Sequence, residues 1–217
     1  MIARGEQSKL TEEYHKYAQI LTISIIPAAL VMTMFSGHLL LMWTRNVTTT
    51  ASVAPLVTLL AIGTALNGLM YLPHALQVAS GWTRIGVQVN AVSVVVLLPC
   101  IYFGVSAFGP FAAAVIWIVL NVGYFVLVIP LMHRKLLPTE MRRWYSQDVF
   151  APFLAALAAE GLIWILAGSP ELGNPGMSML VLATAGMAGL LAALLATPLG
   201  RNQLKSLTQH PYFRITK

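Results

Sequence analysis

The sequence predicts an all-α integral membrane protein that crosses the bilayer six times. Three observations predict this fold class: a shortage of charge, six apolar segments of spanning length, and basic residues restricted to alternate loops. Of the 217 residues, 58% are hydrophobic and only 9% are charged, and the mean hydropathy is +0.76. Soluble domains carry about 25% charged residues. A chain with so little charge cannot cover a water-facing surface, so we expect it in a bilayer.

Six segments are long enough to form membrane-spanning helices, because a helix needs about 20 apolar residues to cross the hydrocarbon core. Turn-forming residues separate several of them, including Gly81, the pair Gly109-Pro110 and the run SPELGNPG. No strand-like alternation of apolar and polar residues interrupts the pattern. We expect a single six-helix unit over residues 1–217, with spans near 17–43, 51–79, 86–107, 110–132, 149–168 and 177–199.

The basic residues predict the orientation in the membrane, because short loops rich in Lys and Arg remain in the cytoplasm. Among the loops after the first, third and fifth spans, Arg45 is the one basic residue. The rest of the 13 basic residues lie in the termini and the other loops. We therefore expect both termini in the cytoplasm. The net charge of +6 follows from this distribution and does not indicate nucleic acid as a partner.

Segment 133–150, HRKLLPTEMRRWYSQDVF, is the longest expected cytoplasmic link. It mixes basic residues with apolar and aromatic ones, which is typical of a segment lying among lipid headgroups. We expect its arginines to contact phosphates and Trp144 to lie at the membrane interface. A binding site for a cytosolic partner is the alternative.

Polar residues in the second span form a narrow stripe. Thr64, Asn67, Tyr71 and His74 are spaced at i, i+3, i+7 and i+10, which on one helix covers an arc of about 80°. Such a stripe faces either a water-filled cavity or a tightly packed neighbouring helix. Four aligned groups favour the cavity, and Gln77 extends the polar surface.

Other polar residues near the spans have two interpretations each. Glu160, in AALAAEGLIWIL, is either part of an ion or proton path or a protonated acid hydrogen-bonded to a neighbouring helix. Arg84 at the start of the third span either sets the topology or, with Gln88, offers a cationic site for a phosphate. For the fourth-span residues Trp117, Asn121 and Tyr124, packing around one satisfied amide is favoured over a cavity.

No enzyme motif is recognisable. A nucleophile elbow, a Walker loop and an HExxH motif are all missing from the sequence. The five histidines lack the spacing of metal ligands. We therefore expect neither an enzyme nor a metal cofactor.

Three stretches carry a family resemblance: LPHALQVASGWTRIGVQVN, FGPFAAAVIWIVLNVGYFVLVIPLMHRKLL and RRWYSQDVFAP. Together with the start, EEYHKYAQILTISIIPAALVMTMFSGHLLLMWT, they resemble the second half of bacterial polysaccharide flippases. These are the O-antigen and related exporters of the multidrug/oligosaccharidyl-lipid/polysaccharide superfamily. The resemblance covers nearly the whole chain.

The resemblance implies a MATE-like fold of two six-helix lobes, of which this chain supplies one. Such a transporter carries an undecaprenyl-diphosphate-linked oligosaccharide to the outer face of the bacterial inner membrane by alternating access. Its cavity is lined largely by the first two helices of each lobe, which here contain Gln19, Thr22, Ser24 and the second-span stripe. Some relatives bind a sodium ion or a proton in the second lobe, a role implied here for Glu160 and Thr184.

The expected partners are the lipid-linked oligosaccharide, membrane lipids, and a missing first lobe or a second half-transporter chain. Three other functions stay open. One is a drug/cation antiporter lobe of the same superfamily, which needs a functional carboxylate. Another is a non-transporting fragment with a structural role. The third is a membrane enzyme of glycan assembly, which the short outer loops disfavour.

Overall fold

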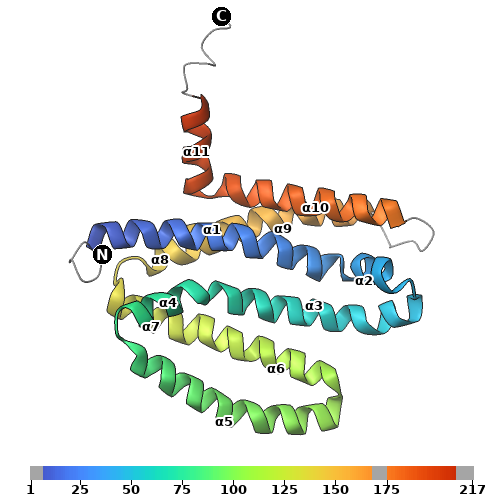
Figure 1. The fold of residues 1–217 in the computed structure, drawn as a ribbon, viewed down its shortest axis with the longest axis horizontal. Coiled ribbons are helices and arrows are strands. Elements are labelled where there is room, and N and C mark those ends of the chain that lie inside the picture. Colours follow the sequence, from blue (N-terminus) through green and yellow to red (C-terminus); the bar gives the residue numbers. More distant parts are fainter. Residues whose placement is uncertain (1–6, 168–174, 209–217) are drawn as a thin grey trace, which may run out of the picture.

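The computed structural model describes residues 7–167 and 175–208, and every regular element within these ranges is helical (Figure 1). The prediction of an all-α fold is therefore confirmed. The elements are α1 (Gln7–Met34), α2 (Ser36–Thr44), α3 (Val47–Leu69), α4 (Tyr71–Ala79), α5 (Thr83–Phe108), α6 (Pro110–Gly123), α7 (Ile129–Leu136), α8 (Met141–Arg143), α9 (Ala151–Ala167), α10 (Pro175–Ala196) and α11 (Pro198–Thr208), with the π-helical segments η2 (Tyr124–Val128) and η3 (Trp144–Phe150).

Six of the described helical segments are long and apolar enough to cross a membrane, which indicates a multi-pass membrane protein. They run back and forth across the bundle, so the described chain begins and ends at the same end of it (Figure 1). The six segments are Gln7–Met34, Val47–Ala79, Thr83–Phe108, Pro110–Leu136, Met141–Ala167 and Gly176–Ala196.

The spans pack as a row in which α1 lies between two groups of helices. α9 and α10 pack on each other and on one side of α1, and α3 packs on the other side. α6 packs against α3, and α5 is the outermost helix, in contact with α6 and α4 (Figure 1). Because α5 has little protein around it, none of its residues is buried.

The first expected span is shifted and divided. α1 begins at Gln7, ten residues before the expected start, and ends at Met34. After Phe35, α2 continues to Thr44, where Arg45 adopts a left-handed conformation (φ 51°) and closes the helix through its N–H bond to Leu41.

The second expected span is broken at Met70. Proline has no backbone N–H, so Pro73 cannot form the helical hydrogen bond to the carbonyl of Leu69. The chain makes a tight turn there, with the Met70 N–H bonded to the Asn67 carbonyl, and restarts as α4 at Tyr71. The polar stripe therefore lies on two helices rather than one.

Trp144 is enclosed by protein, whereas its expected depth at the membrane interface stays a prediction. The fifth spanning segment begins at Met141, eight residues before the expected start, so residues 141–150 belong to the helix rather than to a surface link. Trp144 is only 1% exposed, and its ring packs against those of Phe125, His133 and Tyr145. Because the helical segment is continuous from Met141, the indole of Trp144 lies buried where η3 packs against η2 and α7.

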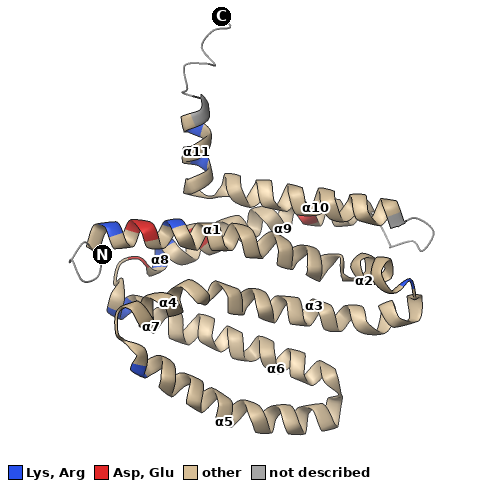
Figure 2. Ribbon diagram, in the orientation of Figure 1, with Lys and Arg blue, Asp and Glu red and all other residues tan. Residues whose placement is uncertain are grey.

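Charge is concentrated at one end of the bundle. Figure 2 shows Lys and Arg at the end that holds the start of α1, the α4–α5 turn, the α7–α8 link and α11. A single basic position, directly after α2, lies at the opposite end, and the sequence places Arg45 there. We call the first of these the basic end. Its cytoplasmic location stays a prediction.

Candidate functional site

A cavity of about 360 Å³ lies between α3, α4, α5, α6 and η2, and we call it the polar cavity because several polar side chains interrupt its mostly apolar lining. It combines aromatic rings, amides and an imidazole, which is an unusual set of groups for helices this apolar. The cavity is lined by Asn67, Met70, Tyr71, His74, Gln77, Gly86, Val89, Asn90, Trp117, Leu120, Tyr124 and Val128.

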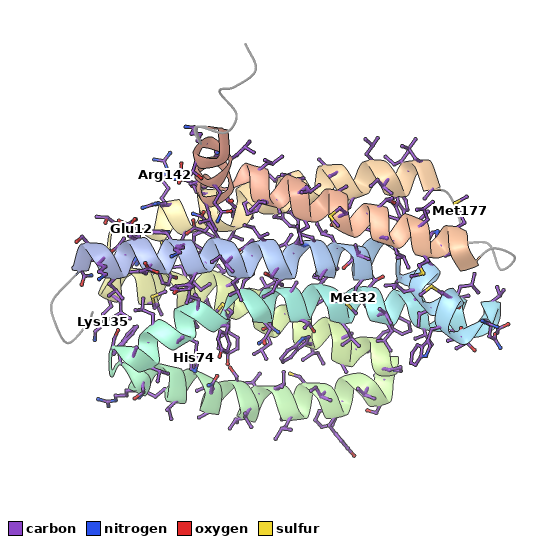
Figure 3. All side chains as sticks on the ribbon, turned by 45° about the horizontal axis from the view of Figure 1, so that its top comes forward. Glu12, Met32, His74, Lys135, Arg142 and Met177 are labelled. Carbon is purple, nitrogen blue, oxygen red and sulfur yellow. The ribbon has the colours of Figure 1, made fainter. Side chains whose placement is uncertain are left out.

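The break at Met70 and one glycine bring the α4 side chains to the cavity. Because α4 restarts at Tyr71, the side chains of Tyr71 and His74 lie one turn apart on its surface. Opposite them, Gly86 of α5 has no side chain, and the position of a β-carbon there is 3.6 Å from Gln77 Oε1 and 4.0 Å from His74 Cε1. Figure 3 shows His74 on the side of α4 that faces α5.

Hydrogen bonds between amides and hydroxyls build two walls of the cavity. Asn67 Nδ2 donates to Asn121 Oδ1 at 3.0 Å, and Asn121 Nδ2 donates to the Trp117 carbonyl at 2.8 Å. Asn121 is fully buried, as expected of a packing amide. On the other wall, the Tyr124 hydroxyl donates to Asn90 Oδ1 at 2.6 Å and fixes the amide of α5 against η2.

Within the described residues, the side chains of Tyr71, His74 and Gln77 form no hydrogen bond to the protein. The cavity therefore offers a phenol, an imidazole and a primary amide to a ligand, beside the ring of Trp117. Together these three side chains supply several hydrogen-bond donors and acceptors along α4. Such a set suits a neutral ligand with many hydroxyl groups.

The structure places only part of the predicted site around this cavity. Asn67, Tyr71, His74 and Gln77 line it, whereas Thr64, three residues before Asn67 on α3, does not. The predicted stripe assumed one continuous helix from 51 to 79. Because the helix breaks at Met70, the α4 residues no longer continue the face of α3 on which Thr64 lies.

Four other expected lining residues lie elsewhere. Ser24 is exposed and donates to the Ile20 carbonyl of its own helix at 2.9 Å. Arg84 is exposed at the start of α5, outside the cavity lining. Gln19 and Thr22 are buried in α1. α1 and the cavity lie on different sides of α3, which explains why α1 contributes no lining residue.

A buried ionic network at the basic end was missed in the sequence. His15 of α1 is 1% exposed, and its Nδ1 is hydrogen-bonded to Asp148 of η3, which is fully buried. Its other ring nitrogen, Nε2, lies 2.9 Å from Glu140 Oε2. The two ring nitrogens of His15 thus contact one carboxyl group each, which ties α1 to η3 and to the link before α8. The signal in the sequence was the pair of acids, Glu140 and Asp148, in an otherwise basic link.

Gln19, one turn after His15, extends the network to α11. Its amide nitrogen donates to Asp148 Oδ1 at 2.8 Å, and its carbonyl oxygen accepts the backbone N–H of Leu199 at 2.9 Å. The network therefore joins α1, the link, η3 and the start of α11. Its burial and its many partners indicate that Gln19 holds helices together.

Glu140 lies at the exposed edge of the network. Burial acts to raise the pKa of its carboxyl, but hydrogen bonds from His15 and Thr139 and the charges of His15 and Arg143 outweigh this, and the pKa is lowered. The carboxylate thus stays ionised at neutral pH and keeps His15 paired on both sides. Beside it, the Tyr14 hydroxyl lies 3.4 Å from His133 Nε2.

Glu160 of α9 is a second buried acid, in a different setting. It is fully buried, and neither carboxyl oxygen has a hydrogen-bond partner in the described part of the protein. The interpretation of Glu160 as an acid hydrogen-bonded to a neighbouring helix is therefore not supported. The side chain lies against Gly189 of α10, where a β-carbon would overlap the carboxyl group.

Thr184 does not join Glu160. It is exposed on α10, and its hydroxyl donates to the carbonyls of Leu180 at 2.8 Å and Val181 at 3.0 Å, within its own helix. No group of three or more His, Cys, Asp or Glu side chains able to hold a metal ion occurs among the described residues.

Comparison with family models, curated proteins and solved structures returned no match to this chain.

Proposed function

We propose that this chain is one six-helix lobe of a transporter that moves an undecaprenyl-diphosphate-linked oligosaccharide to the outer face of the bacterial inner membrane by alternating access. The observation that carries the proposal is the polar cavity, which opens within helices long and apolar enough to span a bilayer. Polar groups at membrane depth are costly unless they line a wet space or bind something. Here three of them are left without protein partners, which supports a ligand.

The chemistry of the lining fits the glycan part of such a substrate. Sugar hydroxyls both donate and accept hydrogen bonds, and Asn67, His74, Gln77 and Tyr71 offer both kinds of partner. Aromatic rings beside polar groups give a binding site apolar contact area as well as orientation. Trp117 supplies such a ring on the opposite wall.

A lipid chain would find apolar surface on the other side of α3. A second cavity of about 370 Å³ there has almost no polar lining and lies among α1, α3, η2, η3 and α9. The lobe thus offers one polar and one apolar space on two sides of a single helix, which suits an amphiphilic substrate. Transport through a closed path also requires a second six-helix lobe, from the same polypeptide or from another chain.

Replacing both Asn67 and His74 with leucine in the assembled transporter is expected to reduce surface glycan at least tenfold at unchanged protein level. The double change removes two polar groups that the glycan needs and fills part of the cavity with apolar side chains. The measurement is surface glycan in cells lacking the native gene. Thr64→Leu is the matched control, because Thr64 is an exposed polar residue of the same span outside the cavity.

Wild-type export by the double variant would refute the cavity proposal. Accessibility gives an independent measurement: after Cys100→Ala removes the native cysteine, single cysteines at 71 and 74 should react with water-soluble thiol reagents in the assembled carrier. Failure of both positions to react would mean that the cavity is sealed by protein or lipid, and would also refute the proposal.

The buried carboxyl of Glu160 supports coupling of transport to an ion, either a proton or sodium. It is also the observation that favours a drug/cation antiporter as the second candidate function. Glu160→Gln keeps the size of the side chain and removes its charge. If the carboxyl couples transport to an ion gradient, transport by Glu160→Gln is expected to become insensitive to that gradient. The check is transport into vesicles with and without an imposed proton or sodium gradient. Unchanged gradient dependence would assign Glu160 a structural role, and transport of organic cations instead of glycan would favour the antiporter.

A further inference from the structure

α11 runs crosswise to the spans at the basic end of the bundle (Figure 1). The chain bends between α10 and α11 at Thr197 and Pro198. The Thr197 hydroxyl donates to the Leu194 carbonyl at 2.7 Å and accepts the N–H of Gly200 at 3.2 Å. Gln19 accepts the N–H of Leu199, as described above, so the first turn of α11 is bonded to both α10 and α1. The direction of α11 is therefore set by specific hydrogen bonds.

The residues of α11 divide between a cationic side and an apolar side. On a helix, Arg201 and Lys205 lie one turn apart on one side, with Asn202 beside them. Leu204 lies about 60° around the helix from Arg201 and about 100° from Lys205, on the flank opposite to Asn202, and is 52% exposed. Helices with this division lie in the plane of a membrane interface, with the apolar side toward the acyl chains and the cations at the headgroups. The crosswise direction of α11 agrees with such a position.

A hollow of about 320 Å³ opens between α11 and the first turns of the fifth span. Among the described residues, its lining has two cationic side chains, two primary amides and no carboxylate, so hydrogen-bond donors predominate. Arg201 is held at the bend, because its Nη2 donates to the Ala196 carbonyl at 2.9 Å. The hollow is lined by Gln147, Pro198, Arg201, Asn202 and Lys205.

We propose that α11 and this hollow bind the phosphodiester headgroup of an anionic phospholipid in the leaflet at the basic end. A phosphodiester carries negative charge and only accepts hydrogen bonds, which complements two cations and two amides. The hollow lies where the spans end, at the depth of lipid headgroups. The apolar side of α11, which includes Leu204, faces the acyl chains of the same leaflet. A phospholipid therefore pairs with the cations through its headgroup and contacts the apolar side through its acyl chains, whereas a soluble anion can only pair with the cations.

The binding site has a structural consequence for the bundle. Because Gln19 bonds to both Leu199 and Asp148, a lipid held under α11 is connected to the buried His15 network. Figure 3 shows Arg142 on the same side of the bundle as α11, which adds a further positive charge to this surface. The inference concerns lipid binding only and does not depend on what the lobe transports.

The test measures lipid binding to the purified full chain in detergent by native mass spectrometry. Phosphatidylglycerol is titrated against wild type and against the double variant Arg201→Gln/Lys205→Gln, with phosphatidylcholine and inorganic phosphate as comparison ligands. Each basic residue near a membrane surface contributes a factor of about five in binding, so the double variant is expected to bind phosphatidylglycerol roughly 20- to 30-fold more weakly. Arg84→Gln/Arg134→Gln is the matched control, because both residues are exposed at the same end but do not line the hollow.

Binding of phosphatidylglycerol by the double variant at wild-type strength would overturn the proposal, as would equal binding of phosphatidylcholine. Displacement of the lipid by millimolar inorganic phosphate would assign the hollow to soluble anions and would also overturn it. Because Arg201 bonds to the bend, a second variant avoids any loss of folding. Asn202→Asp leaves the bend intact, places a carboxylate in the hollow, and is expected to weaken phosphatidylglycerol binding at an unchanged unfolding temperature.

Discussion

The Asp148→Leu variant is expected to lose about 3–5 kcal/mol of unfolding free energy, because removing one partner of a buried ion pair leaves the other charge uncompensated. Asp148 is fully buried and accepts hydrogen bonds from His15 and Gln19. Without it, the Nδ1 atom of His15 and the amide nitrogen of Gln19 lose their buried hydrogen-bond partner. The measurement is denaturant-induced unfolding of the purified chain in detergent micelles, followed by tryptophan fluorescence, since Trp144 lies close to the network.

A surface ion pair on the same helix is the control. Glu13 lies 3.6 Å from Lys16 at the surface, where the Lys16 side chain is exposed and the Glu13 side chain half-buried, so Glu13→Ala is expected to change the unfolding free energy by less than about 1 kcal/mol. The double variant His15→Leu/Asp148→Leu should lose less than the sum of the two single changes, because both charges leave the interior together. Equal losses from Asp148→Leu and Glu13→Ala would mean that water enters the network and that it does not hold the helices together.

Hydropathy and turn residues predicted the number of spans, since both are properties of local sequence. Gly81 and Gly109, which separate spans, adopt positive φ values of 69° and 70°, a conformation that glycine enters without strain. Span boundaries were less predictable. The fifth span starts at Met141 because the amphipathic residues 141–150 continue the helix, and their mixed composition is equally typical of an interfacial segment.

The candidate site was predictable in part. The spacing of Asn67, Tyr71 and His74 indicated a shared polar face, and these residues do line one cavity. Thr64, one turn before Asn67 on the same helix, does not line this cavity, and the angular argument took no account of the break that precedes Pro73. The proline was visible in the sequence, but the direction in which α4 restarts depends on packing against α5 and α7. Glu140 and Asp148 were the signal for the His15 network in the sequence, but their contacts with His15 could not be predicted, because His15 lies more than 100 residues earlier in the chain.

Gly189→Ala is expected to lower the unfolding free energy by about 1–3 kcal/mol, the usual cost of adding volume to a packed interior. Gly189 is buried on α10, and a β-carbon at this position would overlap the side chain of Glu160 from the carboxyl group back to Cγ. The overlap reaches beyond the flexible end of the side chain, so the whole side chain would have to shift. The same unfolding measurement in micelles tests this expectation.

Gly186→Ala, one turn earlier on α10, separates this overlap from the general effect of alanine in a helix. A β-carbon there would lie 3.7 Å from Val31 Cγ2, an ordinary contact, so Gly186→Ala should be neutral or slightly stabilising. Glu160→Ala should relieve the overlap, so the double variant Glu160→Ala/Gly189→Ala should lose less than the two single changes together. Additive losses would mean that Glu160 does not occupy the space beside Gly189. A non-additive loss would show that Gly189 makes room for the buried acid Glu160 between α9 and α10. Leucine or alanine in place of Glu160 would leave no unsatisfied oxygen there.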